Sequence, residues 1–202
     1  MQHVSPTPPA SAAVRSDVQR NRRALLAAAR QLLAVRGDVP MYEVARRAGV
    51  GQATLYRHFP DRRALIAAVA EEVLDEVEEE AAATIPPGPR ALEALLRLIV
   101  ASMVRTHALL QVVEDESSNP REPGTVLHGL VQRLLGMVAE RFAPAKAAAV
   151  LRQDLTVDDV MLVLGMVKGV IEGLPADERG AASARALELA LHGILASPQR
   201  GA

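Results

Sequence analysis

Residues 44–60 carry two short stretches with helical patterning, separated by a turn that contains two glycines. The segment reads VARRAGVGQATLYRHFP. Gly49 can adopt the left-handed backbone conformation of a tight turn, because it has no Cβ. Ala45 is small enough to let two helices cross closely. The segment therefore predicts a helix-turn-helix, an arrangement in which the second helix enters the major groove of DNA.

The apolar residues of this segment are expected to form a small core with the preceding helix: Val44, Ala48, Val50 and Leu55. Polar side chains of the second helix then face outward: Gln52, Thr54, Arg57 and His58. The amide of Gln52 can pair with adenine, the guanidinium of Arg57 with guanine, and the hydroxyl of Thr54 with either base. Gly51 at the N-cap leaves the start of the helix open to a phosphate, which the helix dipole favours.

Composition narrows the possible folds and function classes. Half of the residues are hydrophobic but only 2% are aromatic, so the core must consist of Leu, Val, Ala and Met. There is no cysteine, which excludes disulfides, thiol nucleophiles and cysteine metal sites. Residues 1–13 lack the apolar stretch of a signal peptide. The longest apolar runs, residues 98–104 and 160–167, are far shorter than the ~20 residues of a membrane helix. We expect a soluble cytoplasmic protein without a membrane partner.

Charge is distributed unevenly along a chain whose net charge is −1. Residues 1–66 hold 11 arginines and four acidic residues, whereas residues 67–202 hold 12 basic and 20 acidic residues. A basic module on an acidic body is typical of a protein that binds DNA at one end.

Helical periodicity predicts an all-α fold of about nine helices, with no segment that alternates like a strand. Residues 1–15 are expected to form a disordered arm, with Ser16 capping a first helix that ends before Gly37. Pro86–Pro89 separates two expected domains, a DNA-binding domain at 16–83, whose helix-turn-helix spans about 40–59, and a helical body at 84–202. Further helices are expected at 41–48, 52–58, 61–83, 90–113 (single or kinked), 126–142 (stopped by Pro144), 157–173 and 177–196, with a short helical turn near 145–152.

The continuation TLYRHFPDR at Thr54–Arg62 is much more specific than the turn alone. It resembles the tetracycline-repressor (TetR/AcrR) family, whose N-terminal domain ends in a motif like T-L-Y-x-H-F followed by a basic residue. The resemblance covers about residues 22–69. It implies a three-helix DNA-binding domain, a fourth helix connecting it to the body, and DNA contacts at Gln52, Ala53, Tyr56, Arg57, His58 and Arg62.

The chemistry of these side chains agrees, since Tyr56 and His58 can donate to phosphates and Arg62 can face the DNA backbone. Phe59 is expected to be a core wedge. The helix at 41–48 departs from the family, because Pro40-Met41-Tyr42 supplies no Ser or Thr N-cap. Phosphate anchoring there falls to backbone N–H groups, to Tyr42, or to nothing. Arg22 and its basic neighbours either reach the DNA or simply solvate the first helix.

The resemblance also implies that the last two helices form a four-helix bundle with a partner chain. The expected dimer residues lie on both helices: Leu164, Gly165, Gly169, Leu187, Leu191 and Ile194. Gly165, Gly169 and Gly173 form a stripe along one helix face. We expect this stripe to pack closely against another helix across the dimer, which would offset the cost of about 1 kcal/mol per interior glycine.

An effector pocket is expected among the helices at 90–113, 126–142 and 157–173. It would take an apolar or weakly polar small molecule, with these candidate contacts: Met103, Arg105, His107, His128, Met137 and Met166. A packing or surface role is the competing explanation for each of them.

The predicted function is that of a homodimeric, ligand-responsive bacterial repressor released from a palindromic DNA operator. An activator, a ligand-independent regulator, and a helical ligand-binding protein with a weakened DNA head remain alternatives. We expect no enzyme, cofactor or metal, because the five histidines have no metal-type spacing and Gly49-Val50-Gly51 forms no phosphate-binding fingerprint.

Overall fold

The computed structural model describes residues 10–36, 39–115 and 125–194. Nine α-helices and no strand occur in these ranges, as the periodicity predicts. They form two compact units, the first ending at Val69 and the second beginning at Ala70. In the described ranges no single helix has the length and hydropathy to cross a membrane, although α5 and α6 pass that test as a pair bent by 77°.

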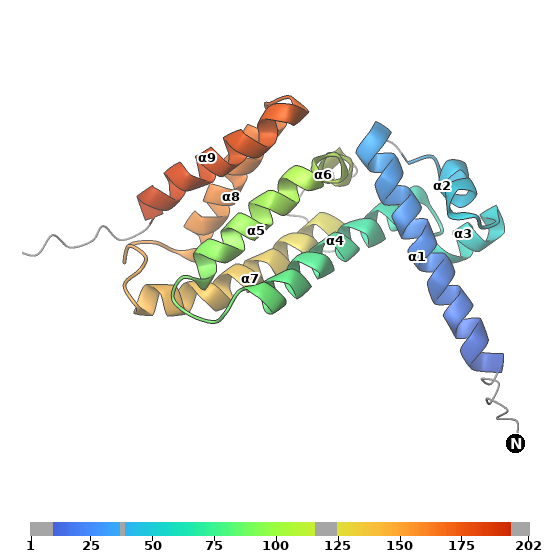
Figure 1. Cartoon of the computed structure of the whole chain (residues 1–202), viewed down its shortest axis with the longest axis horizontal. Helices are drawn as coiled ribbons and strands as arrows, with labels where there is room; N and C mark the ends of the chain where they lie inside the picture. The colour runs from blue at the N-terminus through green and yellow to red at the C-terminus, as the bar shows by residue number, and fades with distance from the viewer. Residues whose placement is uncertain (1–9, 37–38, 116–124, 195–202) are drawn as a thin grey trace, which may run out of the picture. The chain divides into compact units, whose positions relative to one another are not determined.

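The first unit contains α1 (Ala10–Arg36), α2 (Met41–Ala48), α3 (Gln52–His58) and the start of α4 (Arg62–Thr84). In Figure 1, α2 and α3 lie next to each other beside α1. Apolar side chains from all four helices are fully buried and hold the unit together: Leu25, Ala29, Val44, Leu55 and Leu65.

The start of α1 differs from the prediction. The helix begins at Ala10, so the expected disordered arm at 1–15 is too long, and Ser16 lies inside the helix rather than at its N-cap. The reason is local, because Pro9 is the last proline of the arm and the alanine-rich residues that follow favour helix. Residues 1–9 and the expected stop at Gly37 lie outside the described residues.

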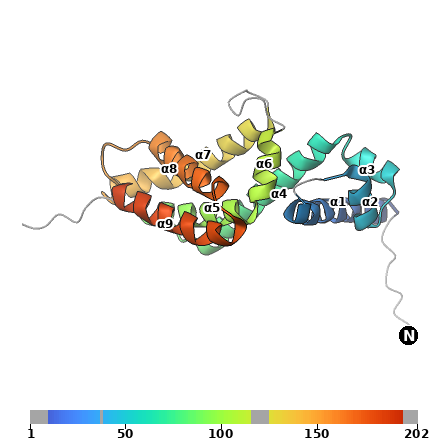
Figure 2. The same cartoon turned by 90° about the horizontal axis from the view of Figure 1, so that it is seen from above.

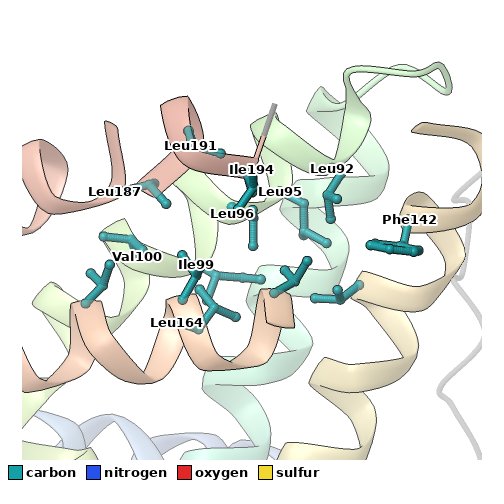
Figure 3. Packing of buried hydrophobic residues seen from close by; sticks show 14 of the residues in the cluster. Leu92, Leu95, Leu96, Ile99, Val100, Phe142, Leu164, Leu187, Leu191 and Ile194 are labelled. Carbon is teal, nitrogen blue, oxygen red and sulfur yellow. The ribbon is translucent and has the colours of Figure 1, made fainter. Parts of the chain in front are cut away.

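The second unit contains the rest of α4 with α5 (Ala91–Arg105), α6 (His107–Asp115), α7 (Val126–Ala147), α8 (Val157–Glu172) and α9 (Ala176–Ile194). Helix α5 contacts α7, α8 and α9, and α8 packs side by side with α9 (Figure 2). Figure 3 shows side chains of these helices converging on one apolar core, among them Leu96 and Ile99 of α5, Leu164 of α8 and Leu191 of α9.

The division between the units falls inside α4 and not at the proline-rich segment 86–89. Val77 and Ala81 of α4 are buried in the same core as Leu92 and Leu95. Their burial assigns the second half of α4 to the body, so the domain boundary expected near residue 84 is about 15 residues too late. Helix α4 therefore belongs to both units.

Side chains cap the starts of α4, α7 and α8. Asp61 Oδ1 accepts the backbone N–H of Ala64 at 2.7 Å and caps α4. Thr156 and Asp159 form a reciprocal capping box at the start of α8.

Pro144 does not stop α7, which continues to Ala147 and takes in part of the helical turn expected at 145–152. Pro144 and Glu140 are both exposed, so the carbonyl that loses its partner lies on the solvent side of the helix. Buried Phe142 and Ala145 hold that segment in the core. The kinked pair expected within 90–113 is present as α5 and α6.

Candidate nucleic-acid interface

The turn between α2 and α3 has the geometry that the sequence predicts. Gly49 lies in the left-handed region, with φ 70° and ψ 26°. Its N–H donates to Arg46 O at 3.2 Å, and the N–H of Val50 donates to Ala45 O at 3.0 Å. These two bonds close the end of α2 and set the direction in which α3 leaves it.

One buried side chain orients α3. Leu55 is fully buried, and Phe59 follows directly at the C-cap with only 2% of its surface exposed. Phe59 is therefore the core wedge that we expected. With these two residues anchored, α3 exposes Gln52, Ala53 and Tyr56 together with Arg57. Tyr56 is 50% exposed, a large fraction for an aromatic side chain.

The remaining predicted contacts are less exposed. Thr54, His58 and Arg62 are half-buried, so each presents only part of its side chain. Of the predicted miniature core, Val44 and Leu55 are fully buried whereas Ala48 and Val50 are half-buried. The structure thus brings Gln52, Ala53, Tyr56 and Arg57 onto one exposed face.

Neither helix of the motif has a side-chain N-cap. Pro40 at α2 and Gly51 at α3 accept no capping bond through a side chain. Glu43 N–H and Thr54 N–H donate to the carbonyls of Pro40 and Gly51, so the first two N–H groups of each helix depend on solvent or on a bound anion. Tyr42, in the first turn of α2, is 62% exposed beside one of these ends.

Basic residues that the sequence reasoning did not select surround the motif. Arg46 and Arg47, in the last turn of α2, and Arg63, near the start of α4, are exposed. Arg46 lies 3.7 Å from the buried carboxylate of Glu43. The excess of positive charge in residues 1–66 predicts a basic surface, but it does not indicate which arginines form that surface.

The chain is similar to a known family of bacterial regulatory proteins. Residues 25–69 match the family described as "Bacterial regulatory proteins, tetR family". The HTH-type transcriptional repressor LfrR of Mycolicibacterium smegmatis is 32% identical over 105 residues, which span 52% of this chain and 55% of that repressor. The crystal structure of a TetR transcription regulatory protein from Mycobacterium vanbaalenii is 29% identical, with a TM-score of 0.62 over 91% of this chain and 99% of that one.

The first unit of this chain therefore carries a TetR-type DNA-binding domain. A TetR transcriptional regulator from Streptomyces coelicolor is also similar, with 25% identity and a TM-score of 0.64 over 88% of this chain and 99% of its own. The matches to both structures extend beyond the helix-turn-helix into the helical body, which is therefore a TetR-type body.

The six expected effector residues do not gather in one place in this TetR-type body. Met103 lines a cleft formed by α4, α5, α6 and α7, to which Lys168 of α8 also contributes. Arg105 lines a separate groove between α5 and α9. Met137 is buried in the core, and Met166 is 61% exposed. Apolar residues that repeat along a helix cannot be assigned to cleft, core or surface before the neighbouring helices are known.

Two of the six expected effector residues are histidines, and neither lines the cleft that contains Met103. His128 is half-buried near the start of α7. His107 is buried at the start of α6. Burial lowers the pKa of His107, and the nearby positive charge of Arg179 lowers it further.

Four of the six expected dimer residues belong to the chain's own core. Leu164, Leu187, Leu191 and Ile194 are all buried there, so the apolar stripes that they form are covered within the chain (Figure 3). Gly165 and Gly169 are exposed, and a Cβ at either position would meet nothing within 4 Å. The glycine stripe therefore packs against no other helix within the described chain.

Proposed function

We propose that this TetR-family chain is a sequence-specific DNA-binding transcriptional regulator, acting as a homodimeric repressor that a small molecule releases from its operator. The observation that carries the proposal is the exposed face of α3. Gln52, Tyr56 and Arg57 are exposed on a helix whose opposite side is anchored by buried Leu55.

The side chains divide into two kinds of contact. Gln52 and Arg57 have the donors and acceptors that read adenine and guanine edges, and they select the operator sequence. Tyr56, Tyr42 and Arg62 hold phosphates, together with the uncapped N–H groups of α2 and α3. The backbone N–H groups replace the Ser or Thr that often begins the equivalent of α2.

Repression is favoured over activation by one finding, the similarity to a protein described as a transcriptional repressor. The aligned region covers 55% of that protein, so its activity is transferred here only as part of the proposal.

An exposed apolar stripe on α8 supports the proposed dimer. Leu162 and Met166 are 66% and 61% exposed, and Gly165 and Gly169 continue their stripe at helical spacing. Leu189 of α9 is 59% exposed. Exposed large apolar residues next to glycines that admit a close neighbour suit a helix from a second copy. Such a dimer places two copies of α3 in successive major grooves about 34–36 Å apart, which requires a palindromic operator.

Release by an effector requires an element that takes part in both DNA binding and effector binding. Helix α4 carries Arg62 near the DNA-facing residues and Val77 in the core of the body, so it belongs to both units. A ligand that binds more tightly to one position of α4 than to another shifts the equilibrium between DNA-binding and released forms.

Selection of bound DNA from a random pool by the purified chain tests the proposal. We expect a palindrome to be enriched by the wild type and lost with Tyr56→Ala. Arg90→Ala, on an exposed residue of the second unit, is the control and should recover the same palindrome. Absence of enrichment by the wild type, or equal affinity for a half-site and the palindrome, would contradict a dimeric sequence-specific regulator.

A further inference from the structure

The cleft of the second unit is small and almost entirely apolar. It has a volume of about 200 Å³ and is lined by aliphatic side chains such as Val73 of α4, Ile99 of α5, Leu109 of α6 and Val131 of α7. A cavity of about 150 Å³ holds a molecule of benzene, whereas drug-sized ligands occupy roughly 300–1,000 Å³. The cleft therefore suits a compact molecule of low polarity.

The charges at the cleft lie at one end. Lys168 Nζ lies 2.9 Å from Glu114 Oε1, and both residues line the cleft. Lys168 also forms an ion pair with Glu172, one helical turn along α8. A single ammonium group thus lies between two carboxylates.

This arrangement disfavours charged ligands of either sign. An anion that approaches Lys168 meets the carboxylates of Glu114 and Glu172, whereas a cation that approaches Glu114 meets the ammonium already paired with it. Either kind of ion must also leave water for an apolar cleft, which is costly without a free partner. An uncharged hydroxyl needs only one carboxylate lone pair, and Glu114 has several.

A second polar group, close to Lys168 and Glu114 but outside the cleft's lining, lacks a partner. His107 shares its face of α6 with Leu110 and Glu114, both of which line the cleft. The side chain of His107 is 94% buried, and its Nε2 makes no hydrogen bond to any residue that the structure describes. Buried nitrogens of this kind are rare in native proteins and point to a bound group or water.

We propose that this cleft binds an uncharged, mainly hydrocarbon molecule of about eight to twelve non-hydrogen atoms, with one hydroxyl-type group at the Glu114–Lys168 end. The inference rests on the proposed function only in regarding the molecule as the effector.

Three eight-carbon probes of equal length test the charge selection. Octan-1-ol, octanoate and octylammonium are titrated calorimetrically into the full chain at pH 7.5, without DNA. We expect octan-1-ol to bind with at least tenfold higher affinity than either ion. Equal or tighter binding of an ion, or no saturable binding of octan-1-ol, would overturn the proposal.

Variants of neighbouring residues on α7 locate the site. Val131→Trp fills the cleft and should weaken octan-1-ol binding at least tenfold. Gln132→Trp, at the adjacent exposed position, should leave binding unchanged. Retained binding in Val131→Trp would place the molecule elsewhere. The probe series with the wild type stands even if Val131→Trp does not fold.

The charged end has its own test. Lys168→Met leaves two carboxylates without their ammonium and should reverse the preference toward octylammonium. The double variant Glu114→Gln/Glu172→Gln leaves Lys168 without its carboxylates and should reverse it toward octanoate. If both variants keep the wild-type preference for octan-1-ol, the charged residues at this end do not select the ligand's charge.

Operator binding separates this inference from the proposed function. Tyr56→Ala lies outside the cleft's lining and should bind octan-1-ol with the wild-type affinity. If octan-1-ol binds but never weakens the operator complex, effector release is wrong while the ligand class stands. If the operator is bound and octan-1-ol is not, the ligand class is wrong while the DNA-binding function stands.

Discussion

Arg22 of α1 lies over the ring of Phe59 at the end of α3, with its Cζ 4.9 Å from the ring centre. Phe59 is buried, whereas Arg22 is exposed. The aromatic ring therefore contacts one face of the guanidinium, while the Arg22 side chain remains exposed. This contact favours the first of the two roles left open for Arg22, a phosphate contact rather than simple solvation.

Substitution of Arg22 should weaken binding to all DNA sequences to a similar degree. Arg22→Ala removes one cationic contact, so the slope of log K against log salt concentration should fall in magnitude by about 0.9. Arg22→Lys keeps the charge but loses the stacked plane, and it should preserve most of that slope. Fluorescence anisotropy at several salt concentrations measures it. An unchanged slope in Arg22→Ala would show that Arg22 touches no phosphate.

Arg57→Ala should act differently, because Arg57 is assigned to a base. We expect a loss of about 1–3 kcal/mol on the selected palindrome and discrimination at one base pair to disappear, while binding to unrelated DNA changes little. Anisotropy titrations with the palindrome and its single-base variants provide the measurement, with Arg90→Ala as the control of equal charge change. A uniform loss on every sequence would assign Arg57 to a phosphate instead.

Two neighbouring glycines should respond differently to alanine. Gly49 has φ 70°, so Gly49→Ala should destabilise the first unit by about 1–2 kcal/mol, although the added Cβ would meet nothing within 4 Å. Gly51 has φ −70° and equally open surroundings, and Gly51→Ala should change stability by less than about 1 kcal/mol. Urea unfolding followed by circular dichroism compares them. Equal effects would mean that the left-handed turn does not determine the cost.

The proposed dimer depends on the exposed stripe of α8. Leu162→Glu/Met166→Glu places two charges on it and should convert the dimer to a folded monomer. Operator affinity should then fall at least a hundredfold, since a monomer holds only one half-site. Sedimentation velocity gives the mass, and Val18→Glu, at an exposed apolar position of α1, serves as the control. A double variant that sediments as a dimer would place the interface elsewhere.

Acid should destabilise the chain through His107. Burial first, and the charge of Arg179 second, lower its pKa in the folded chain, while Glu172 and Glu114 oppose this shift and Lys168 adds to it. Below about pH 6.5 the unfolded chain binds a proton that the folded chain does not, so stability is lost as pH falls from 6.5 to the lowered pKa.

The slope from one proton cannot exceed about 1.4 kcal/mol per pH unit. Urea midpoints between pH 7.5 and 5 should decline less steeply in His107→Leu than in the wild type. His192→Gln, on an exposed residue of α9, should behave as the wild type does. A His107→Leu profile parallel to the wild type would exclude His107 as the source.

The helix-turn-helix could be predicted from the sequence because it depends on local signals. The bounds of α2 and α3 match the prediction because their starts, the left-handed Gly49 and the turn itself depend on residues within a few positions. The capping of α4 by Asp61 and of α8 by Thr156 was predictable for the same reason. Leu55 and Phe59 are buried as expected, and of the four side chains expected to face outward, Gln52 and Arg57 are exposed whereas Thr54 and His58 are half-buried.

Only the tertiary structure decided which apolar residues of the body are buried in its core and which stay exposed. Leu164 and Leu191 turn into the chain's own core, whereas Leu162 and Met166 of the same helix pair stay exposed. Likewise, the passage of α7 through Pro144 and the assignment of half of α4 to the body depend on contacts distant in sequence. Turn chemistry and capping act through the local backbone, which the sequence specifies directly. The burial of a helix face depends on which other helix covers it, and that choice is made only when the chain packs.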